Sequence, residues 1–380
     1  MAAGALREKG RGSVGLVLLA RLFHFAALNN AMKSPFQLRA TSGENPKFRN
    51  PRFSSLCAGI LAASLIFGGR ALVAQAGPAR TALSPARELT DELGRKVRIP
   101  QKVDRVVSLA PNLTEIVFAL GDGNHLAGDT NYCDYPPEAL QKPHVGGLIN
   151  PSLETIASLM PDVVLATKSI NRRETVEALD RTGLPVFVTG QPHSVDEMIA
   201  SVEHIGGALG VESSAAALAG EMRARLAALD RRLTGIPPRR VLFVVWTDPL
   251  ISAGRNTFIS DALRRAGGRS IVETRAEWPH VSLEEVVHQQ PEVLVFADAH
   301  AGDTQRDIDA LRNRSGWKNL KAVQQDKIVV VSDSINRPAP RMLDAIEQLA
   351  RALHPEAFAS RAAPSANSRA IVEEACACAR

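Results

Sequence analysis

Cysteine is scarce in this chain, which has four among its 380 residues. The four are Cys57, Cys133, Cys376 and Cys378, and the last two stand in a Ser/Ala-rich tail without the spacing of a zinc site. So few cysteines exclude a framework of disulfides. A chain of this length does not need one, because it has room for about two domains with large cores.

The motifs of several enzyme classes are also missing. The sequence has no Gly-rich phosphate loop ending in Lys-Ser or Lys-Thr, no His-Glu-x-x-His segment and no Gly-x-Ser-x-Gly elbow. Cys133 and His280 could in principle reach a metal, but a single Cys or His is more often an ordinary loop residue. We therefore predict no catalytic residue, no metal site and no resident cofactor, with a bilobal enzyme as the alternative hypothesis.

A basic surface for nucleic acid is lacking too, although the net charge of the chain is +5. Residues 1–76 hold ten Lys or Arg and two Asp or Glu, whereas the remaining residues hold 35 basic and 38 acidic side chains. The excess positive charge thus belongs to the N-terminal segment. No run of Lys and Arg is interleaved with aromatic residues, so we expect no nucleic-acid partner.

The N-terminal segment, residues 1–76, has the pattern of an export signal. Three basic residues precede an uncharged run over residues 53–69, and Ala74-Gln-Ala76 offers a small-x-small cleavage site. A transmembrane anchor is the alternative, although the run is short for a membrane span. The sequence leaves two start positions open, Met1 and Met32. We expect a cleaved signal peptide and a soluble mature protein in the periplasm.

One element occurs twice, 130 residues apart. The first copy covers residues 152–166 and the second residues 282–296. Each copy predicts a Ser-capped amphipathic helix with a carboxylate in its first turn, then a proline, an acid and an apolar strand. In the second copy Glu285, three residues after Ser282, is expected to complete a capping box. The repetition predicts two similar α/β lobes.

Strands alternate with helices on both sides of a proline-free stretch whose second half, 213–233, is amphipathic. We predict an α/β fold of two Rossmann-like lobes with mainly parallel sheets, joined by a long α-helix. The predicted parts are the export segment 1–76, the N-terminal lobe 88–192, the connecting helix 193–236, the C-terminal lobe 237–355 and a disordered tail 356–380.

Aromatic side chains stand at predicted strand-end loops. Tyr132, Tyr135, Trp246 and Trp278 are four of the five Tyr and Trp residues in the chain. Aromatic faces on loops that oppose across a cleft suit a large, flat, partly apolar ligand. Tyr135 is more simply explained by packing against the prolines that follow it, whereas Tyr132 and Trp278 favour ligand contact.

Several segments carry a family resemblance: 105–111, Tyr132-Cys-Asp-Tyr-Pro-Pro137, Leu153-Glu154 with Pro161-Asp162, Trp278-Pro-His-Val-Ser-Leu-Glu284 and 332–341. The chain resembles the cobalamin-binding periplasmic proteins of ABC importers, within the iron-chelate, haem and cobalamin class of substrate-binding proteins. The resemblance implies that ligand is clamped between two lobes. The residues it places at the cleft are Tyr132, Trp246, Trp278, Asp333, Ser334, Ile335, Asn336 and Arg337.

The resemblance also implies a partner. Glu154 and Glu284, one in each copy of the repeat, are implied to dock on arginines of an importer permease, which works with an ATPase. We expect a monomer that delivers a corrinoid, with haem or a ferric siderophore as the alternative cargo. A sensor domain is a further alternative, disfavoured because no helical signalling segment is attached.

The resemblance is incomplete at the cleft. Leu148 and Thr167 stand where an enteric cobalamin binder has tryptophans, and Ser334-Ile335 replaces an aromatic pair. The cleft is therefore poorer in aromatic side chains than that of such a relative. Arg172, Arg173 and Arg337 are candidates for contact with an anionic chelate.

Overall fold

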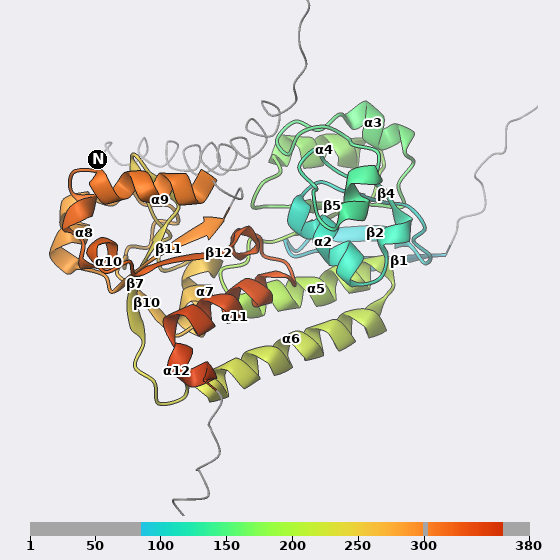
Figure 1. Cartoon of the computed structure of the whole chain (residues 1–380). Coiled ribbons are helices and arrows are strands. Elements are labelled where there is room, and N and C mark those ends of the chain that lie inside the picture. Colours follow the sequence, from blue (N-terminus) through green and yellow to red (C-terminus); the bar gives the residue numbers. More distant parts are fainter. Residues whose placement is uncertain (1–84, 299–302, 360–380) are drawn as a thin grey trace, which may run out of the picture.

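The computed structural model describes residues 85–298 and 303–359, and it contains two lobes (Figure 1). The predicted export segment, Cys57, Cys376 and Cys378 lie outside the described residues. Within these residues each lobe contains a four-stranded parallel sheet, with strand order β4-β3-β5-β6 in the first and β10-β7-β11-β12 in the second. The predicted α/β fold with two parallel sheets is confirmed.

The N-terminal lobe surrounds a sheet whose central strand β5 is buried along its whole length. Such a continuous apolar run is typical of a parallel strand that is covered on both faces. An antiparallel hairpin of β1 and β2 packs beside the sheet through the carboxylate of Asp91, whose Oδ2 accepts a hydrogen bond from Val188 N of β6 at 3.3 Å. The elements are β1 (Ala86–Thr90), β2 (Lys96–Pro100), β3 (Val106–Ser108), α2 (Pro111–Ala119), β4 (Leu126–Gly128), α3 (Leu153–Ser158), β5 (Val163–Thr167), α4 (Arg173–Arg181) and β6 (Val186–Thr189).

The C-terminal lobe repeats this plan. The apolar run 240–246 is divided between two sheets: β7 ends at Val244, and Trp246 begins a small hairpin of β8 and β9. The elements are β7 (Arg239–Val244), β8 (Trp246–Thr247), β9 (Leu250–Ile251), α7 (Phe258–Arg265), β10 (Gly268–Ser270), α8 (Leu283–Gln289), β11 (Val293–Asp298), α9 (Asp303–Asn313), α10 (Lys321–Gln324), β12 (Ile328–Ser332), the 3-10 turn η4 (Asp333–Asn336), α11 (Met342–Leu353) and α12 (Pro355–Phe358).

The connection between the lobes differs from the predicted single helix over 193–236. It consists of α5 (Val195–Leu209) and α6 (Glu212–Leu233), separated at Gly210, whose φ is 80°. Glycine adopts this left-handed conformation without steric cost, and it commonly ends helices. Figure 1 shows α6 running beneath both lobes with α5 beside it. The long helix is α6 alone, and it covers the amphipathic stretch 213–233 of the sequence.

Ion pairs attach this connection to the C-terminal lobe. Arg265 of α7 is paired with Asp196 of α5 at 2.6 Å and with Asp230 of α6 at 3.0 Å. On the opposite side of α6, Arg225 is paired with Asp344 of α11 at 2.6 Å. These ion pairs join α5 and α6 to the helices α7 and α11 of the C-terminal lobe.

The two copies of the repeated element end in the same way. Met160 and Gln290, each one residue before the proline, have φ values of 44° and 49°. Left-handed backbone is uncommon for residues other than glycine. Arg105 Nε donates to Leu159 O at 2.7 Å, and Arg240 Nη2 donates to the carbonyl of Gln289 at 2.5 Å. Each helix is thus capped at its C-terminal end by an arginine. Arg105 immediately precedes β3, and Arg240 lies within β7.

The N-terminal ends of the two copies differ. Ser152 caps α3 as predicted, because its Oγ accepts a hydrogen bond from Thr155 N at 3.1 Å. Ser282 makes no side-chain cap hydrogen bond at α8, and Glu285 instead accepts one from Gln289 Nε2 at 2.8 Å. The predicted capping box is wrong, since Glu285 is held by a residue one turn further along the same helix.

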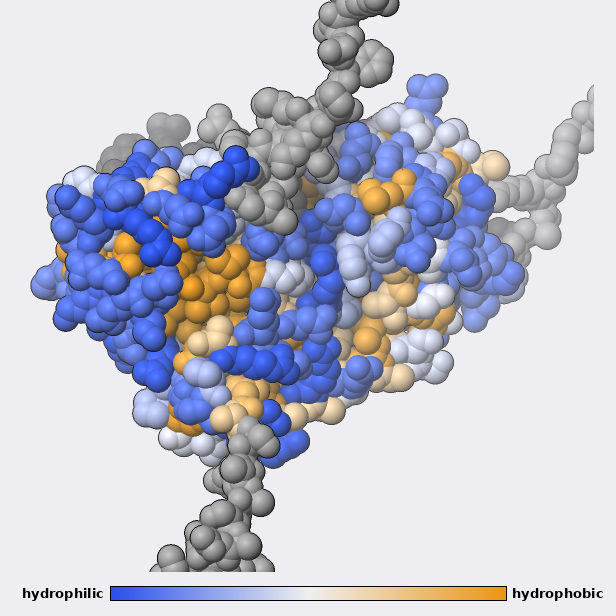
Figure 2. Space-filling view, in the orientation of Figure 1, coloured by the Kyte–Doolittle hydropathy of each residue, from blue (hydrophilic) through white to orange (hydrophobic). Residues whose placement is uncertain are grey.

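Two smaller features complete the fold. The predicted disordered tail, 356–380, begins with ordered residues, because α12 continues to Phe358; residues 360–380 lie outside the described part. Strand β12 lies at the edge of its sheet, and Ile328, Val329 and Val330 are only half-buried there. Figure 2 shows an apolar region on this side of the C-terminal lobe and hydrophilic surface around it.

Candidate ligand-binding cleft

The predicted cargo residues follow the carboxyl ends of parallel strands, where ligands bind in open α/β sheets. Tyr132 follows β4, Trp246 follows β7, Trp278 follows β10, and the segment 333–337 follows β12. In Figure 1 the strands of the C-terminal sheet point toward the N-terminal lobe. The structure thus assigns these residues to strand-end loops of both lobes.

The loop that carries Trp278 is hydrogen-bonded to the segment 252–254. Gly254 N donates to Glu277 O at 2.9 Å, and Ser252 N donates to Pro279 O at 3.2 Å. The indole of Trp278 is half-buried and packs on the main core, while its Nε1 atom is buried without a hydrogen-bond partner in the described structure. A buried donor of this kind gains free energy from an acceptor on a ligand.

Trp246 and Tyr132 differ in how far they reach solvent. Trp246 is 36% exposed, and its Nε1 donates to Asp248 O at 2.7 Å across the turn of the β8–β9 hairpin. Tyr132 is half-buried. The exposed ring of Trp246 offers an aromatic face at the carboxyl edge of the C-terminal sheet.

The segment after β12 presents only part of what the sequence predicts. Ser334 and Ile335 are 1% and 0% exposed, because η4 directs them into the lobe. Ser334 Oγ donates to Ser332 Oγ at 3.0 Å. Burial therefore gives no support to a cargo contact by these two side chains. Asp333 and Asn336 are half-buried.

Arg337 forms ion pairs with carboxylates from both lobes. Its guanidinium lies 3.2 Å from Glu115 Oε1 and 3.0 Å from Asp134 Oδ2, both on the N-terminal lobe, and 3.3 Å from Asp333 Oδ2. The Arg337 side chain is 11% exposed. Burial disfavours the charged form of Asp134, but the hydrogen bonds and charge of Arg337 outweigh burial and lower the pKa of this carboxyl.

A second arginine joins the same contact. Arg341 Nη2 donates to Glu115 Oε1 at 2.9 Å, and its guanidinium lies 3.9 Å from the centre of the Tyr135 ring. Tyr135 thus makes a cation–π contact across the lobes. The sequence suggested only that this ring packs against the prolines that follow it. We call Glu115, Asp134, Asp333, Arg337 and Arg341 the interlobe charge cluster.

The predicted docking carboxylates lie on the two short repeated helices. Glu154 is in the first turn of α3, Glu284 is in the first turn of α8, and both are exposed. Neither belongs to the interlobe charge cluster or to the strand-end loops. The structure thereby separates these carboxylates from the residues predicted to contact cargo.

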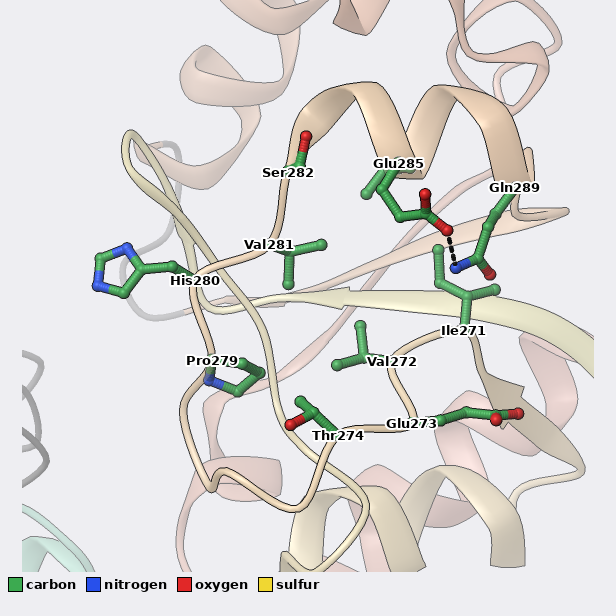
Figure 3. Close-up of a pocket in the computed structure, with 11 residues that line it drawn as sticks. Ile271, Val272, Glu273, Thr274, Pro279, His280, Val281, Ser282, Glu285 and Gln289 are labelled. Carbon is green, nitrogen blue, oxygen red and sulfur yellow. Dashed lines mark hydrogen bonds between the residues drawn. The ribbon is translucent and has the colours of Figure 1, made fainter. Parts of the chain in front are cut away.

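A pocket of about 270 Å³ lies beside α8 (Figure 3). Its apolar floor includes Val272 and Val286, and Glu285 with Gln289 forms part of its polar wall. His280 points away from it. This volume is slightly below the range of about 300–1,000 Å³ that is usual for small-molecule sites, and none of the predicted cargo residues lines the pocket.

A family model described as periplasmic binding protein matches residues 106–334. The chain belongs to the periplasmic binding protein family. A vitamin B12-binding protein of Vibrio cholerae is 30% identical over 256 residues, which are 66% of this chain and 89% of the relative. An ABC transporter substrate-binding lipoprotein of Bacillus subtilis, YvrC, is 28% identical over 277 residues, covering 71% of this chain and 86% of the relative.

Solved structures agree with this family. The heme-binding protein RhuT of Roseiflexus, in its apo form, has a TM-score of 0.58 and 31% identity, and covers 67% of this chain and 99% of its own. The vitamin B12-binding protein BtuF of Vibrio cholerae has a TM-score of 0.57 and 29% identity, covering 68% and 99%. This binding protein is therefore a substrate-binding component of an ABC importer in the class that takes vitamin B12, haem and iron chelates, and not an enzyme.

In residues 85–298 and 303–359 neither the acidic, His and Cys side chains nor the helices point to a metal site or a membrane span. Neither Cys133, His280 nor any other His, Cys, Asp or Glu belongs there to a group of three or more that could hold a metal ion. No helix of these residues is both long and apolar enough to cross a bilayer. Cys133 is 1% exposed in this binding protein, and burial raises the pKa of its thiol to about 12, so the thiol stays protonated at neutral pH.

Three residues of the interlobe charge cluster were missed in the sequence of this binding protein: Glu115, Asp134 and Arg341. Glu115 carries the only charge in α2 and is 4% exposed there. A single charged residue in an otherwise uncharged helix is the signal that could have identified it, because buried carboxylates need a partner. Asp134 and Arg341 lie inside segments that were singled out for other reasons.

Asp129, at the end of β4, is a buried carboxyl behind the loop of Tyr132. Its Oδ1 lies 2.8 Å from His144 Nδ1, and its Oδ2 is buried without a partner in the described structure. Burial raises the pKa of Asp129 to about 6, although the hydrogen bond and charge of His144 oppose the shift.

Protonation of Asp129 is expected to make stability depend on pH. The folded protein holds this proton more tightly than the unfolded chain, whose Asp titrates near 3.8. The free energy of unfolding should therefore fall as pH rises from about 4 to about 6, and this group should lower it no further above that range. Urea unfolding of the protein and of Asp129→Asn across these pH values measures the effect. Parallel profiles for the two proteins would contradict it.

Proposed function

We propose that this binding protein captures a corrinoid, cobalamin, between its lobes and delivers it to the permease of an ABC importer. The observation that carries the proposal is the charge balance at the cleft end. Two guanidinium groups there, Arg337 and Arg341, face the three carboxylates of the interlobe charge cluster. The cluster thus carries one excess negative charge and no unneutralised cation.

This charge balance favours a cargo without carboxylates. A corrinoid presents amide side chains around its ring, whereas haem presents propionates and many ferric siderophores are anionic. A cluster with excess negative charge repels haem propionates and anionic siderophores. Arginines that are already paired with carboxylates have little capacity to bind these anions. Arg173 lies on the exposed surface of α4, where its Nε donates to Glu177 Oε1 at 2.6 Å. The vitamin B12-binding relative supports the same cargo.

Aromatic side chains of the strand-end loops provide the apolar contacts of the proposed site. Trp246 and Trp278 come from one lobe and Tyr132 from the other, so a planar ring clamped between the lobes has aromatic contacts on both sides. Asp333 and Asn336 are further polar contacts at the end of β12.

Haem is the second candidate cargo. The observation in its favour is the similarity to the heme-binding protein RhuT, at 31% identity with coverage of 99% of that chain. Against it stands the pairing of Arg337 and Arg341, because haem propionates would have to displace Glu115 or Asp134 to reach a cation.

Titration calorimetry with cobalamin, cobinamide and haem tests the cargo. We expect saturable binding of cobalamin with a Kd of about 1 μM or tighter, a free energy of about −8 kcal/mol or better. Haem should bind more weakly under the same conditions. Tight binding of haem or of a ferric siderophore, with no binding of either corrinoid, would overturn the corrinoid assignment.

Delivery places further requirements on the chain. We propose that Glu154 and Glu284 contact arginines of the permease, whose ATPase drives transport, and that residues 1–76 direct a monomer to the periplasm. Both carboxylates are exposed on short helices of like construction, one in each lobe, and both helices are capped by an arginine at their C-terminal ends. N-terminal sequencing of the exported protein checks for cleavage after Ala76.

A further inference from the structure

The interlobe charge cluster is open to solvent on one side. The side chains of Asp134, Asp333 and Arg341 are 58%, 30% and 23% exposed, while Glu115 and Arg337 are 2% and 11% exposed. Asp333 and Arg337 belong to the loop after β12, and Asp134 lies two residues beyond Tyr132. The cluster therefore borders the proposed cargo site and contributes to the charge that a cargo meets there.

The two arginines are held in the geometry that binds carboxylates. Glu115 accepts from Arg341 through both carboxylate oxygens, Oε1 at 2.9 Å and Oε2 at 3.2 Å. Asp134 accepts from both terminal nitrogens of Arg337. Planar two-point pairs of this type are the strong form of arginine recognition, and an external carboxylate would need the same donor atoms.

We infer that Glu115 and Asp134 are specificity-determining residues, which exclude carboxylate-bearing chelates from the cleft by occupying Arg337 and Arg341. This inference rests on the proposed corrinoid function and names the residues that set its cargo class. Removing both negative charges leaves two guanidinium groups with Asp333 as the only carboxylate of the cluster. The cluster then carries one excess positive charge, with free donors directed to the cleft.

The variants Asp134→Asn and Glu115→Gln/Asp134→Asn test this inference. Both substitutions keep the shape of the side chain and remove its charge. Cobalamin and haem are titrated into each variant and into the unaltered protein, and the ratio of the two Kd values is compared. Glu203→Gln is the matched control, because Glu203 also forms a two-point pair with an arginine, Arg223, but on the exposed surface between α5 and α6.

The double variant is expected to shift the Kd ratio toward haem by about tenfold or more, the size of one charge-assisted hydrogen bond. Asp134→Asn alone should produce part of this shift. Because the Asp134 side chain is largely exposed, this single variant is expected to fold even if replacement of the buried Glu115 prevents folding of the double variant. The control should leave the ratio unchanged.

The outcomes separate the inference from the function on which it rests. Unaltered protein that prefers haem overturns the corrinoid function. Preference for cobalamin in the unaltered protein, together with a Kd ratio that Asp134→Asn leaves unchanged in a folded variant, overturns the inference alone. An equal shift in Glu203→Gln would also overturn it, because the change would then follow net charge and not the cluster.

Discussion

Replacing Glu154 and Glu284 together with alanine is expected to reduce cargo import by at least about tenfold while cargo binding is retained. The loss of one charge pair at a docking interface costs about 2 kcal/mol or more when the pair is desolvated, and two pairs are removed here. Both side chains are exposed and lie apart from the strand-end loops, so the cleft is unchanged. Uptake of labelled cobalamin by cells and titration of the purified variant measure the two effects.

Other first-turn carboxylates provide the controls for this experiment. Glu174 opens α4 and Glu285 lies beside Glu284 on α8. Each favours its helix electrostatically by about 0.3–1 kcal/mol, as Glu154 and Glu284 do, so alanine at Glu174 and Glu285 removes the same stabilisation without removing a docking group. These control variants should import cargo normally. Equal loss of binding and import in the Glu154/Glu284 variant would point to a folding defect and contradict the docking role.

Replacing Gly254 with alanine is expected to lower both stability and cargo affinity severely. A Cβ atom at this position would lie 1.8 Å from Ala276 O and 2.9 Å from Thr274 O. Both are backbone atoms, so the loop that carries Trp278 has to move away. Overpacking of this kind costs about 3 kcal/mol or more, and displacement of Trp278 removes an aromatic contact from the cleft. Thermal unfolding and cobalamin titration measure the two losses.

Gly220 provides the comparison for Gly254. It lies within α6, and an added Cβ would meet no atom within 4 Å. Alanine at Gly220 is expected to stabilise the helix by about 0.5–1 kcal/mol, because glycine loses more backbone entropy than alanine on folding. If Gly254→Ala unfolded at the same temperature as Gly220→Ala and bound cobalamin equally well, the close packing of the 274–280 loop would have no role in the site.

The repeated element could be predicted because its signals are local. A serine, a first-turn carboxylate and a proline define each helix within ten residues, and the following strand is uniformly apolar. The structure adds what local patterns do not contain, namely the capping of each helix by Arg105 or Arg240. The capping box predicted at Ser282 was wrong for the same reason. Glu285 accepts a hydrogen bond from Gln289, a residue outside the capping pattern.

Helix boundaries and contacts between distant residues could not be predicted as well from the sequence. The proline-free stretch suggested one helix, but the left-handed φ of Gly210 divides it, and a glycine in a helical pattern does not reveal its φ. Arg337 was expected at the cleft, yet its partner Glu115 is 222 positions away in the sequence. No periodicity links such distant residues, so the pairing that defines the cleft end required the structure.

The chain crosses from the first sheet to the second only once, through α5 and α6. This connectivity has a consequence for the order in which the two lobes fold. Each parallel sheet is built from one contiguous part of the sequence, 106–189 and 239–332. The first sheet can therefore form while the second half of the chain is still unfolded. Glu115 and Arg341 are separated by 226 positions, and contacts between distant residues form late because loop closure is costly. The interlobe charge cluster is accordingly expected to be among the last contacts made, so that the cleft acquires its final width at the end of folding.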